Sequence, residues 1–510
     1  MISFLKAHFK TYGWLWLLTV ALGFAFPMRE GLKPDAAVYA TIARNVTQSG
    51  SWWPLRFADW QFNPFYEHPP GTLWFMALFM KLFGATYFSA ALFSRLCALG
   101  ASLLVVACFG LHFGSATPAS NSNEKHLQRS ALALLLLTTW GQWMKYAFSA
   151  QLEGPLALAA AALFYLTLKL SSMDGTSTLL ERRRFTLLLL LTGFTGFMFK
   201  GFMFLSVLGA AGLWTILKRS RTAFFGTLSA LAGSVLAIGF LFGLDRFHRT
   251  EFSRDYWLRQ IFGKIQAQGE SVEGGLHIDF AKLMERVLPP FGSEFRFAPL
   301  WSGFFWLACA GILVFDRKRL RSPITSLALL VWVIFMIPIC LAAHQMPHWT
   351  SALYPLAAAL LAANFPDRWL TTVHAALANK WMWKISVAIV LAMAILPYSR
   401  RSPWGRGIEW LDYRPLILAQ TDVRNPLIYT TDDQALYMAF AYSAWYIDPS
   451  YPIRWITAKE ALDAHCTGGL LWTGEYVGQL NEAPIRAQGW TPAFTQSPGQ
   501  TLWQCLTPVR

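Results

Sequence analysis

Long apolar runs alternate with short polar segments along most of the 510-residue chain. A helix of about 18 apolar residues can cross a bilayer. The run at 72–84 is shorter and carries Lys81, so we interpret it as an interfacial or re-entrant helix. The pattern predicts a polytopic α-helical membrane protein with about 11–13 transmembrane helices. The predicted spans lie at about 11–28, 89–112, 130–149, 154–170, 185–199, 201–217, 224–243, 298–315, 323–342, 351–364 and 383–398.

Lysine and arginine residues gather in the short segments between these runs. The net charge is +15, but this distribution is typical of cytoplasmic loops, so we expect no nucleic-acid partner. If 72–84 does not span, the basic clusters share the side of Lys6, at 125–129, 182–184, 218–221, 317–321 and 367–368. The N-terminus is then cytoplasmic, and the loops 29–71 and 245–297 face outward. The first apolar run lacks a small-residue cleavage site before Arg29, which predicts a retained helix.

The pattern changes at about residue 399. Short strand-like runs (LIYTT, IRWI, GLLWTG and TLWQCL) alternate there with the helix-like stretches DQALYMAFAY and TAKEALDAH. We therefore predict two domains, a membrane domain at 1–398 and a small α/β domain at 399–510 on the outer face. Cys466 and Cys505 lie in this outer domain, where a disulfide and two free thiols both remain open.

The segment 33–71 is the only long polar interval in the first hundred residues, and it contains two acids, Asp35 and Glu67. Val38, Ile42 and Val46 recur at helical spacing, which predicts a short amphipathic helix on the membrane surface that begins near Asp35. Glu67 is followed by a histidine and two prolines, which stiffen the exit from the loop.

The motif D-x-A-x-Y-A-x-I-A-R-N, followed by Y-E-H-P-P-G-x-L-W and K-L-F-G, resembles the membrane glycosyltransferases of the GT-C superfamily. The likeness is to the branch that contains the lipid A aminoarabinose transferase and the bacterial relatives of protein O-mannosyltransferases. The resemblance implies a catalytic role for Asp35 and a role for Glu67 and His68 in binding a lipid phosphate. The family often has a second acid after the first, and this chain has Ala36 there.

The resemblance continues in order to about residue 365. L-E-G-P-L-A-L, F-x-x-K-G and H-x-M-P-H-W-x-x-x-L-Y-P are similar to a second-acid position, a family lysine and a K-L-P-x-Y-x-x-P element. Carried over, the likeness implies a second catalytic acid and further contacts to the donor phosphate and the substrate. Those residues are Glu153 as second acid, Lys200 and Arg259 as donor-phosphate ligands, and Tyr39, His344, His348 and Tyr354 as substrate contacts.

The function that the resemblance implies is transfer of a sugar from a polyprenyl phosphate, such as undecaprenyl phosphate, to a periplasmic acceptor at the bacterial inner membrane. The expected acceptor is lipid A or lipopolysaccharide, with a protein as the alternative. Asp35 would deprotonate the attacking group, and cations would stabilise the departing phosphate. In some relatives a divalent metal ion (Zn, Mg or Mn) lies near the loop glutamate, which here implies Glu67 and His277 as ligands.

Other interpretations of these residues remain open. Asp35 could cap a helix, Glu153 could be a first-turn acid, and Lys200 could extend its amine toward the membrane surface. His344 and His348, four residues apart, could bind a metal or be solvated, and Arg259 could lie on a solvated face. At the level of function, a transporter or flippase is the alternative from another class, because buried acids and a lysine also suit proton-coupled transport. Because the second loop acid is absent, a non-catalytic binder of lipid-linked sugars is a third.

Overall fold

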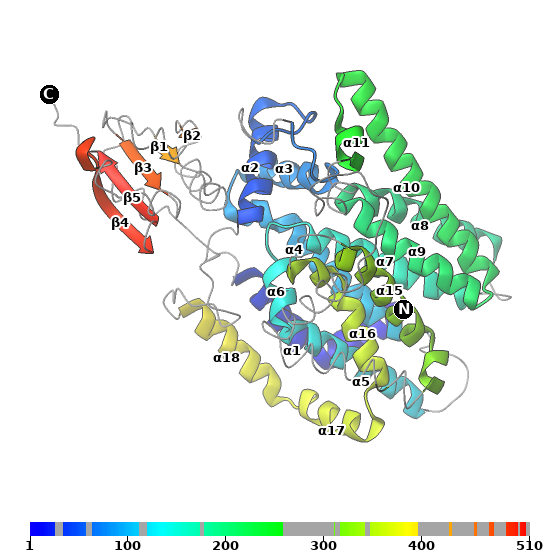
Figure 1. Ribbon diagram of the computed structural model, residues 1–510. Helices are drawn as coiled ribbons and strands as arrows, with labels where there is room; N and C mark the ends of the chain where they lie inside the picture. The colour runs from blue at the N-terminus through cyan, green and yellow to red at the C-terminus, as the bar shows by residue number, and fades with distance from the viewer. Residues whose placement is uncertain are drawn as a thin grey trace.

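The computed structural model describes residues 1–25, 34–57, 64–111, 120–173, 178–258, 311, 317–341, 347–395, 428–430, 453–455, 469–473, 486–497 and 500–505. A bundle of packed helices fills most of the molecule, and a small β-sheet near the C-terminus lies beside it (Figure 1). The predicted boundary at about residue 399 lies outside the described residues.

The helical part follows the apolar runs closely. Its elements are α1 (Ile2–Ala25), α2 (Pro34–Ser49), α3 (Gly71–Phe83), α4 (Tyr87–Phe109), α5 (Ser120–Thr139), α6 (Gly141–Ala147), α7 (Glu153–Ser171), α8 (Leu179–Lys200), α9 (Phe202–Leu217), α10 (Arg221–His248), α11 (Phe252–Asp255), α15 (Pro323–Leu341), α16 (Tyr354–Asn364), α17 (Asp367–Leu377) and α18 (Trp381–Ile395), with 3₁₀ turns η2 (Arg317–Arg321) and η3 (Pro347–Leu353). Three helices within the described ranges are long and apolar enough to cross a membrane, at Phe88–Phe109, Glu153–Ser171 and Arg221–His248. The predicted span at 298–315 lies outside the described residues except for position 311.

The predicted span at 130–149 is wrong as a single helix. The helix in this region, α5, starts ten residues earlier than predicted, at Ser120. It ends before Trp140, whose extended backbone separates α5 from α6. The Trp140 ring stacks on the Tyr354 ring at 4.4 Å, so tertiary packing holds the break. Tertiary contacts also accompany the polar N-terminal extension of α5. Lys125 and Arg129 near the start of this helix bind Asp367 of α17 at 2.8 and 2.9 Å.

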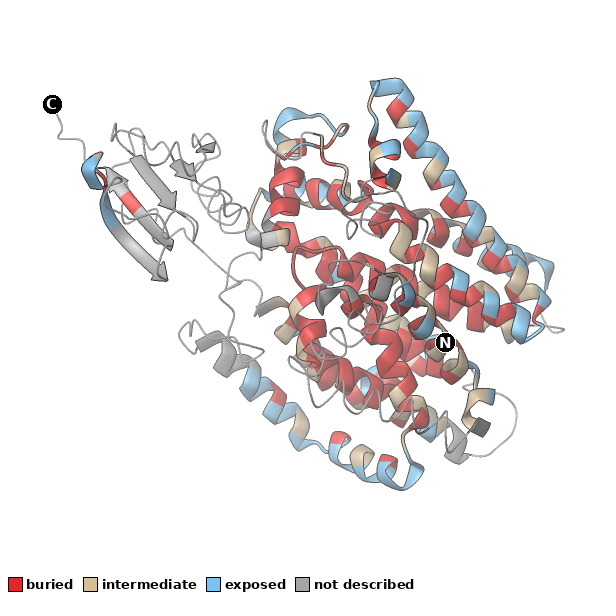
Figure 2. Cartoon of the chain, viewed as in Figure 1, coloured by how far each residue is buried: buried red, intermediate tan, exposed pale blue. Residues whose placement is uncertain are grey.

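Apolar burial is deepest where α4, α5, α7 and α16 meet (Figure 2). The outer faces of α8 and α10 are instead apolar and exposed, as in Leu187, Leu191, Leu231 and Val235. In water such a surface would be a liability, whereas a bilayer covers it at no cost. Large apolar side chains therefore cover the rim of the bundle as well as its interior, as in a membrane protein.

Helices α8 and α10 approach each other through glycines. A methyl group built on Gly193 would overlap the carbonyl oxygen of Ala230, and one built on Gly233 would overlap that of Leu190. The Ser234 hydroxyl donates across the contact to the Gly193 carbonyl at 3.0 Å. Small residues that permit backbone contact, with a serine bond between helices, are the usual means of helix association in membranes. We call this contact the glycine clasp.

The predicted basic clusters at 125–129, 218–221, 317–321 and 367–368 are joined by contacts at one end of the bundle. Besides the Asp367 ion pairs, Arg129 donates to the Ala363 carbonyl, and Arg319 of η2 donates to that of Asn364. Lys218, after α9, reaches the Leu320 carbonyl of η2 at 3.4 Å. We call this the basic end.

The C-terminal strands form one mixed sheet in the order β2-β1-β3-β5-β4, in which β1 is parallel to β2 and β3, and β5 is antiparallel to β3 and β4. The four predicted strand-like runs overlap β1 (Ile428–Thr430), β2 (Ile453–Trp455), β3 (Gly469–Thr473) and β5 (Gln500–Cys505), whereas β4 (Thr491–Ser497) was not predicted. The predicted helices of this region and Cys466 lie outside the described residues.

Candidate active site

Helix α2 presents the first predicted acid. Its apolar positions Val38, Ile42 and Val46 are buried, as their spacing predicts, and the helix packs against α3. Asp35 is half-buried and lies inside the first turn, one residue after the start at Pro34, not at the capping position before the helix. A carboxylate there is favoured by the positive end of the helix dipole, so the helix holds the charge at a defined point.

The second acid, Glu67, precedes α3 and lies close to α2. Its neighbour His68 packs edge-on against the ring of Tyr39 of α2, with 5.9 Å between the ring centroids. Phe65 contacts both rings, at 6.4 Å from Tyr39 and 6.3 Å from His68. The aromatic contacts therefore bring the two ends of the polar loop together.

The pKa of the buried Tyr39 hydroxyl depends on the charged groups around it. Burial raises the pKa of this phenol well above its usual range, and the charges of Asp35, Glu153 and Glu67 raise it further, in that order of size. Three carboxylates can act on one hydroxyl only if all three are near it. Four residues singled out from three separate motifs thus converge at one place.

The third acid is held in an ion pair. The Lys200 ammonium donates to the Glu153 carboxylate at 2.5 Å, and the two side chains are only 6% and 2% exposed. Glu153 starts α7 and Lys200 ends α8, so each charge also complements its own helix dipole. The interpretation of Lys200 as a lysine that extends to the membrane surface is therefore wrong, because its amine is buried against a carboxylate.

Close backbone packing fixes this ion pair on both sides. Gly154 follows Glu153, and a methyl group built on it would lie 2.5 Å from the Ser94 carbonyl oxygen of α4. Gly201 follows Lys200 with φ of 53°, a left-handed conformation that glycine adopts without strain. A side chain at Gly201 would also collide with the Tyr256 hydroxyl. Glycines are needed at both positions for the backbones to come this close.

The turn between α10 and α11 leads into a segment that packs next to Lys200. The Asp245 carboxylate accepts bonds from the Thr250 hydroxyl at 2.6 Å and from the Phe252 and Ser253 amides at 3.1 and 2.7 Å. This segment carries Tyr256, whose hydroxyl accepts from the amide of Phe202 at 2.9 Å, two residues after Lys200. Neither Asp245 nor Tyr256 was predicted as a site residue from the sequence. A serine and a threonine soon after Asp245 are a local signal for the turn, but nothing local indicates that Tyr256 reaches α9.

The remaining predicted site residues do not join this cluster within the described ranges. Tyr354 is fully buried in the main core, stacked on Trp140, with its hydroxyl 3.4 Å from that of Thr350. The backbone of His348 lies in η3, which packs against α7, but its side chain is not described. Arg259, His277 and His344 lie outside the described residues. Within the described residues no three His, Cys, Asp or Glu side chains are placed so that they could share a metal ion, although Asp35, Glu67 and Glu153 all act on Tyr39. The Glu67/His277 metal site remains untested.

No protein-family model and no curated protein matches the chain. Two solved structures do match over nearly their full length. They are ArnT from Cupriavidus metallidurans bound to undecaprenyl phosphate and the same protein in the apo state. Each has a TM-score of 0.61 and 14% sequence identity and covers 97% of this chain and 98% of its own. The chain therefore shares the fold of these two structures, as the motifs predicted.

Proposed function

We propose that this protein is a membrane glycosyltransferase that transfers a sugar from a polyprenyl phosphate to an acceptor. The convergence of Asp35, Glu67 and Glu153 around Tyr39, beside the buried ammonium of Lys200, carries the proposal. A shared fold with ArnT, whose crystal structure holds undecaprenyl phosphate, supports the choice of donor. Carboxylates beside a fixed cation suit a reaction in which a proton is removed and a phosphate departs.

In the proposed reaction Asp35 accepts the proton of the acceptor's nucleophile. The nucleophile forms a bond to C1 of the sugar while the bond from C1 to the phosphate oxygen breaks, and polyprenyl phosphate leaves with the electron pair. Lys200 stabilises the phosphate as a point charge, and His68 does so when protonated. Glu153 is the second acid and also holds the lysine. Glu67 and Arg259 complete the proposed phosphate site.

Lipid A or lipopolysaccharide is the proposed acceptor and a protein the alternative, with the site facing the periplasm of a bacterial inner membrane. The sidedness is supported by the contacts at the basic end. Helices α7 and α8 carry Glu153 and Lys200 at one end and Arg182, Arg183 and Arg184 at the other. Helices of 19 and 22 residues separate these ends by about 30 Å, the thickness of the hydrocarbon core.

A transporter is less well supported. Transporters place their ion and substrate sites near the middle of the bilayer, on broken helices. Here the acids belong to one end of the bundle, at the starts of α2 and α7 and just before α3. The missing second loop acid does not favour a non-catalytic binder. The Ala36 side chain is fully buried, so an acid at this position would have no solvated space. We therefore propose that Asp35 is the sole loop acid that acts as base.

Purified protein incubated with a polyprenyl-phosphate sugar and lipid A should release polyprenyl phosphate, measured by mass spectrometry. Asp35→Asn should abolish release, and Asp367→Asn, which removes an acid at the basic end, should not. Lys200→Ala should raise the KM for the donor, and Lys200→Arg should retain part of the activity, because one charge-assisted contact is worth about 1.5–3 kcal/mol. Release that is equal in the wild type and Asp35→Asn would contradict the proposed function.

A further inference from the structure

A surface rich in cations and exposed aromatic rings lies at the basic end, away from the acids. Residues from three helices contribute to it, and all are exposed to solvent. Trp369 and Trp381 are each 55% exposed, which is high for the largest side chain in proteins. We call this surface the basic collar. It comprises Lys6, Phe9 and Lys10 of α1, Arg368 and Trp369 of α17, Lys380 in the turn after α17, and Trp381, Trp383 and Lys384 of α18.

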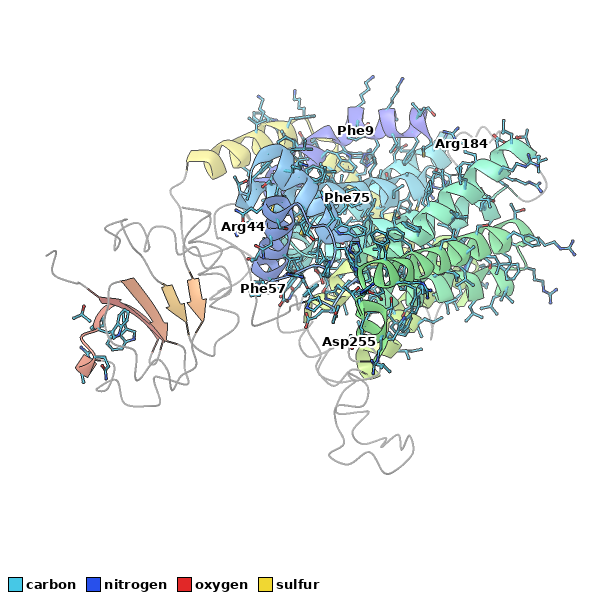
Figure 3. All side chains as sticks on the ribbon, turned by 90° about the horizontal axis from the view of Figure 1, so that it is seen from above. Phe9, Arg44, Phe57, Phe75, Arg184 and Asp255 are labelled. Atoms are coloured by element: carbon cyan, nitrogen blue, oxygen red, sulfur yellow. The ribbon has the colours of Figure 1, made fainter. Side chains whose placement is uncertain are left out.

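The fold holds these separate segments together. The Tyr12 hydroxyl lies 2.5 Å from Nδ1 of His374, and Trp14 donates its indole N–H to the Leu377 carbonyl at 2.9 Å. The Trp383 ring lies against Gly13, within 3.1 Å of the place where a methyl group would stand. Figure 3 shows α1, with Phe9 labelled, and α18 along the same edge of the bundle. The α1 cations and those of α17 and α18 therefore belong to one rigid surface.

The collar cations differ from the other cations of the basic end in their partners. Lys125 and Arg129 share the Asp367 carboxylate. In the described part of the chain, the ion pairs include no acid bound to Lys6, Lys10, Arg368, Lys380 or Lys384.

Two of these cations rest on tryptophan rings instead. The Lys384 ammonium lies 4.1 Å from the centre of the Trp381 ring, and the Arg368 guanidinium lies 5.7 Å from that of Trp369. A ring face steadies a cation without using up its N–H donors, which stay directed at an outside anion. The collar therefore offers oriented cations that form no ion pair with any acid in the described ranges.

The position of the collar identifies the kind of anion. It borders the exposed apolar side chains of α18, among which Ile385, Val387 and Ile389 are 47%, 42% and 38% exposed. Tryptophan beside lysine at the edge of an apolar helix face is the arrangement that suits lipid headgroups, with rings and cations at headgroup height and acyl chains below. A soluble acidic protein or a nucleic acid would leave this apolar face uncovered.

We propose that the basic collar is a binding site for anionic phospholipids of the membrane, on the leaflet opposite the site of Asp35 and Glu153. The phosphodiester binds the lysines and Arg368, and the acyl chains lie along α18. The proposal is independent of the glycosyl-transfer chemistry, since none of its residues belongs to the acid cluster.

The test uses the full chain in nanodiscs of equimolar phosphatidylglycerol and phosphatidylcholine, and native mass spectrometry measures the ratio of the two lipids that stay bound. The wild type should retain phosphatidylglycerol preferentially. Exchange of the five collar cations for glutamine should lower this preference at least tenfold, and the preference should also fall as salt rises. Lys384→Gln alone should lower it measurably, which guards against a fivefold variant that does not fold.

A matched control removes five exposed cations elsewhere at the basic end, by glutamine at Arg183, Arg184, Arg221, Lys318 and Arg321. It should leave the preference within about twofold of the wild type, because a general surface charge acts weakly beyond the Debye length. An equal loss in the collar and control variants would show that net charge alone attracts the lipid and would overturn the proposal. An unchanged preference in both collar variants would also overturn it.

Discussion

The ion pair between Glu153 and Lys200 supports a quantitative prediction. The two charges are 2.5 Å apart and almost wholly buried. Removal of one partner from such a pair strands the other charge in a medium that solvates it poorly and typically costs about 3–5 kcal/mol. Glu153→Gln and Lys200→Met keep most of the side-chain volume, so each should destabilise the protein mainly through this electrostatic cost and not through a cavity.

The double variant should behave differently from the sum of the two. Replacement of a buried ion pair by neutral groups of similar shape is often close to neutral, because the cost of desolvating both charges disappears together with their attraction. We expect the double variant to be more stable than the sum of the single effects predicts by about 1–3 kcal/mol, the range seen for residues in direct contact.

Two buried cysteines can serve as probes of unfolding in this experiment. Cys97 and Cys108 of α4 are 3% and 1% exposed, so a thiol-reactive fluorophore reaches them only when the helices separate. Thermal unfolding of variants whose other four cysteines are serine would then rank the wild type, the two single variants and the double variant.

A surface pair provides the control. Lys125 and Asp367 are 2.8 Å apart but half exposed, and loss of such a pair costs less than about 1 kcal/mol. Lys125→Met should therefore barely move the unfolding temperature. If the Glu153→Gln and Lys200→Met effects simply add, the two charges are not coupled and the ion pair is not what holds the ends of α7 and α8 together.

Three further predictions concern the base, the glycine clasp and the orientation. Asp35→Asn should lower turnover by roughly 10²–10⁴-fold with donor binding preserved, since asparagine keeps the shape but accepts no proton; near wild-type turnover would move the base to another acid. Gly193→Ala should lower the unfolding temperature by the equivalent of about 1–3 kcal/mol, whereas Gly209→Ala, which faces open space, should not; equal effects would refute the clasp. In a cysteine-free chain, an impermeant thiol reagent applied to intact spheroplasts should label a cysteine at Ser49 but not one at Ser172, and the reverse pattern would invert the topology.

Most of the helical part could be predicted because its signal is local. A long apolar run predicts a helix because a bilayer surrounds it. The helical spacing of Val38, Ile42 and Val46 also predicted which face of α2 is buried. The proximity of the acids was predicted from their assignment to one side of the membrane, because residues that face one side are confined to a thin layer. Strands β1, β2, β3 and β5 were found for a similar reason, since apolar and β-branched residues dominate them.

The features that were missed depend on partners far away in the chain. The break at Trp140 depends on a ring more than two hundred residues away, at Tyr354. Helix α17 has an amphipathic sequence too short for a span, and it is held by Trp14 and by the ion pairs of Asp367. The bond from Phe202 to the hydroxyl of Tyr256 is of the same kind. Such contacts leave no periodic trace in the sequence.

The glycine clasp limits how the site can change when a donor arrives. Helix α8 meets α10 backbone to backbone, and α7 meets α4 in the same way at Gly154. Neither α7 nor α8 can therefore slide without breaking van der Waals contacts. In the proposed reaction, an incoming phosphate would therefore draw the ammonium away from Glu153 by turning the four-carbon side chain of Lys200. Side-chain torsions change on a timescale of picoseconds to nanoseconds when free, far faster than helices rearrange. The proposed exchange of a carboxylate for a phosphate on Lys200 would thus be a local event, and the rest of the bundle would not need to rearrange.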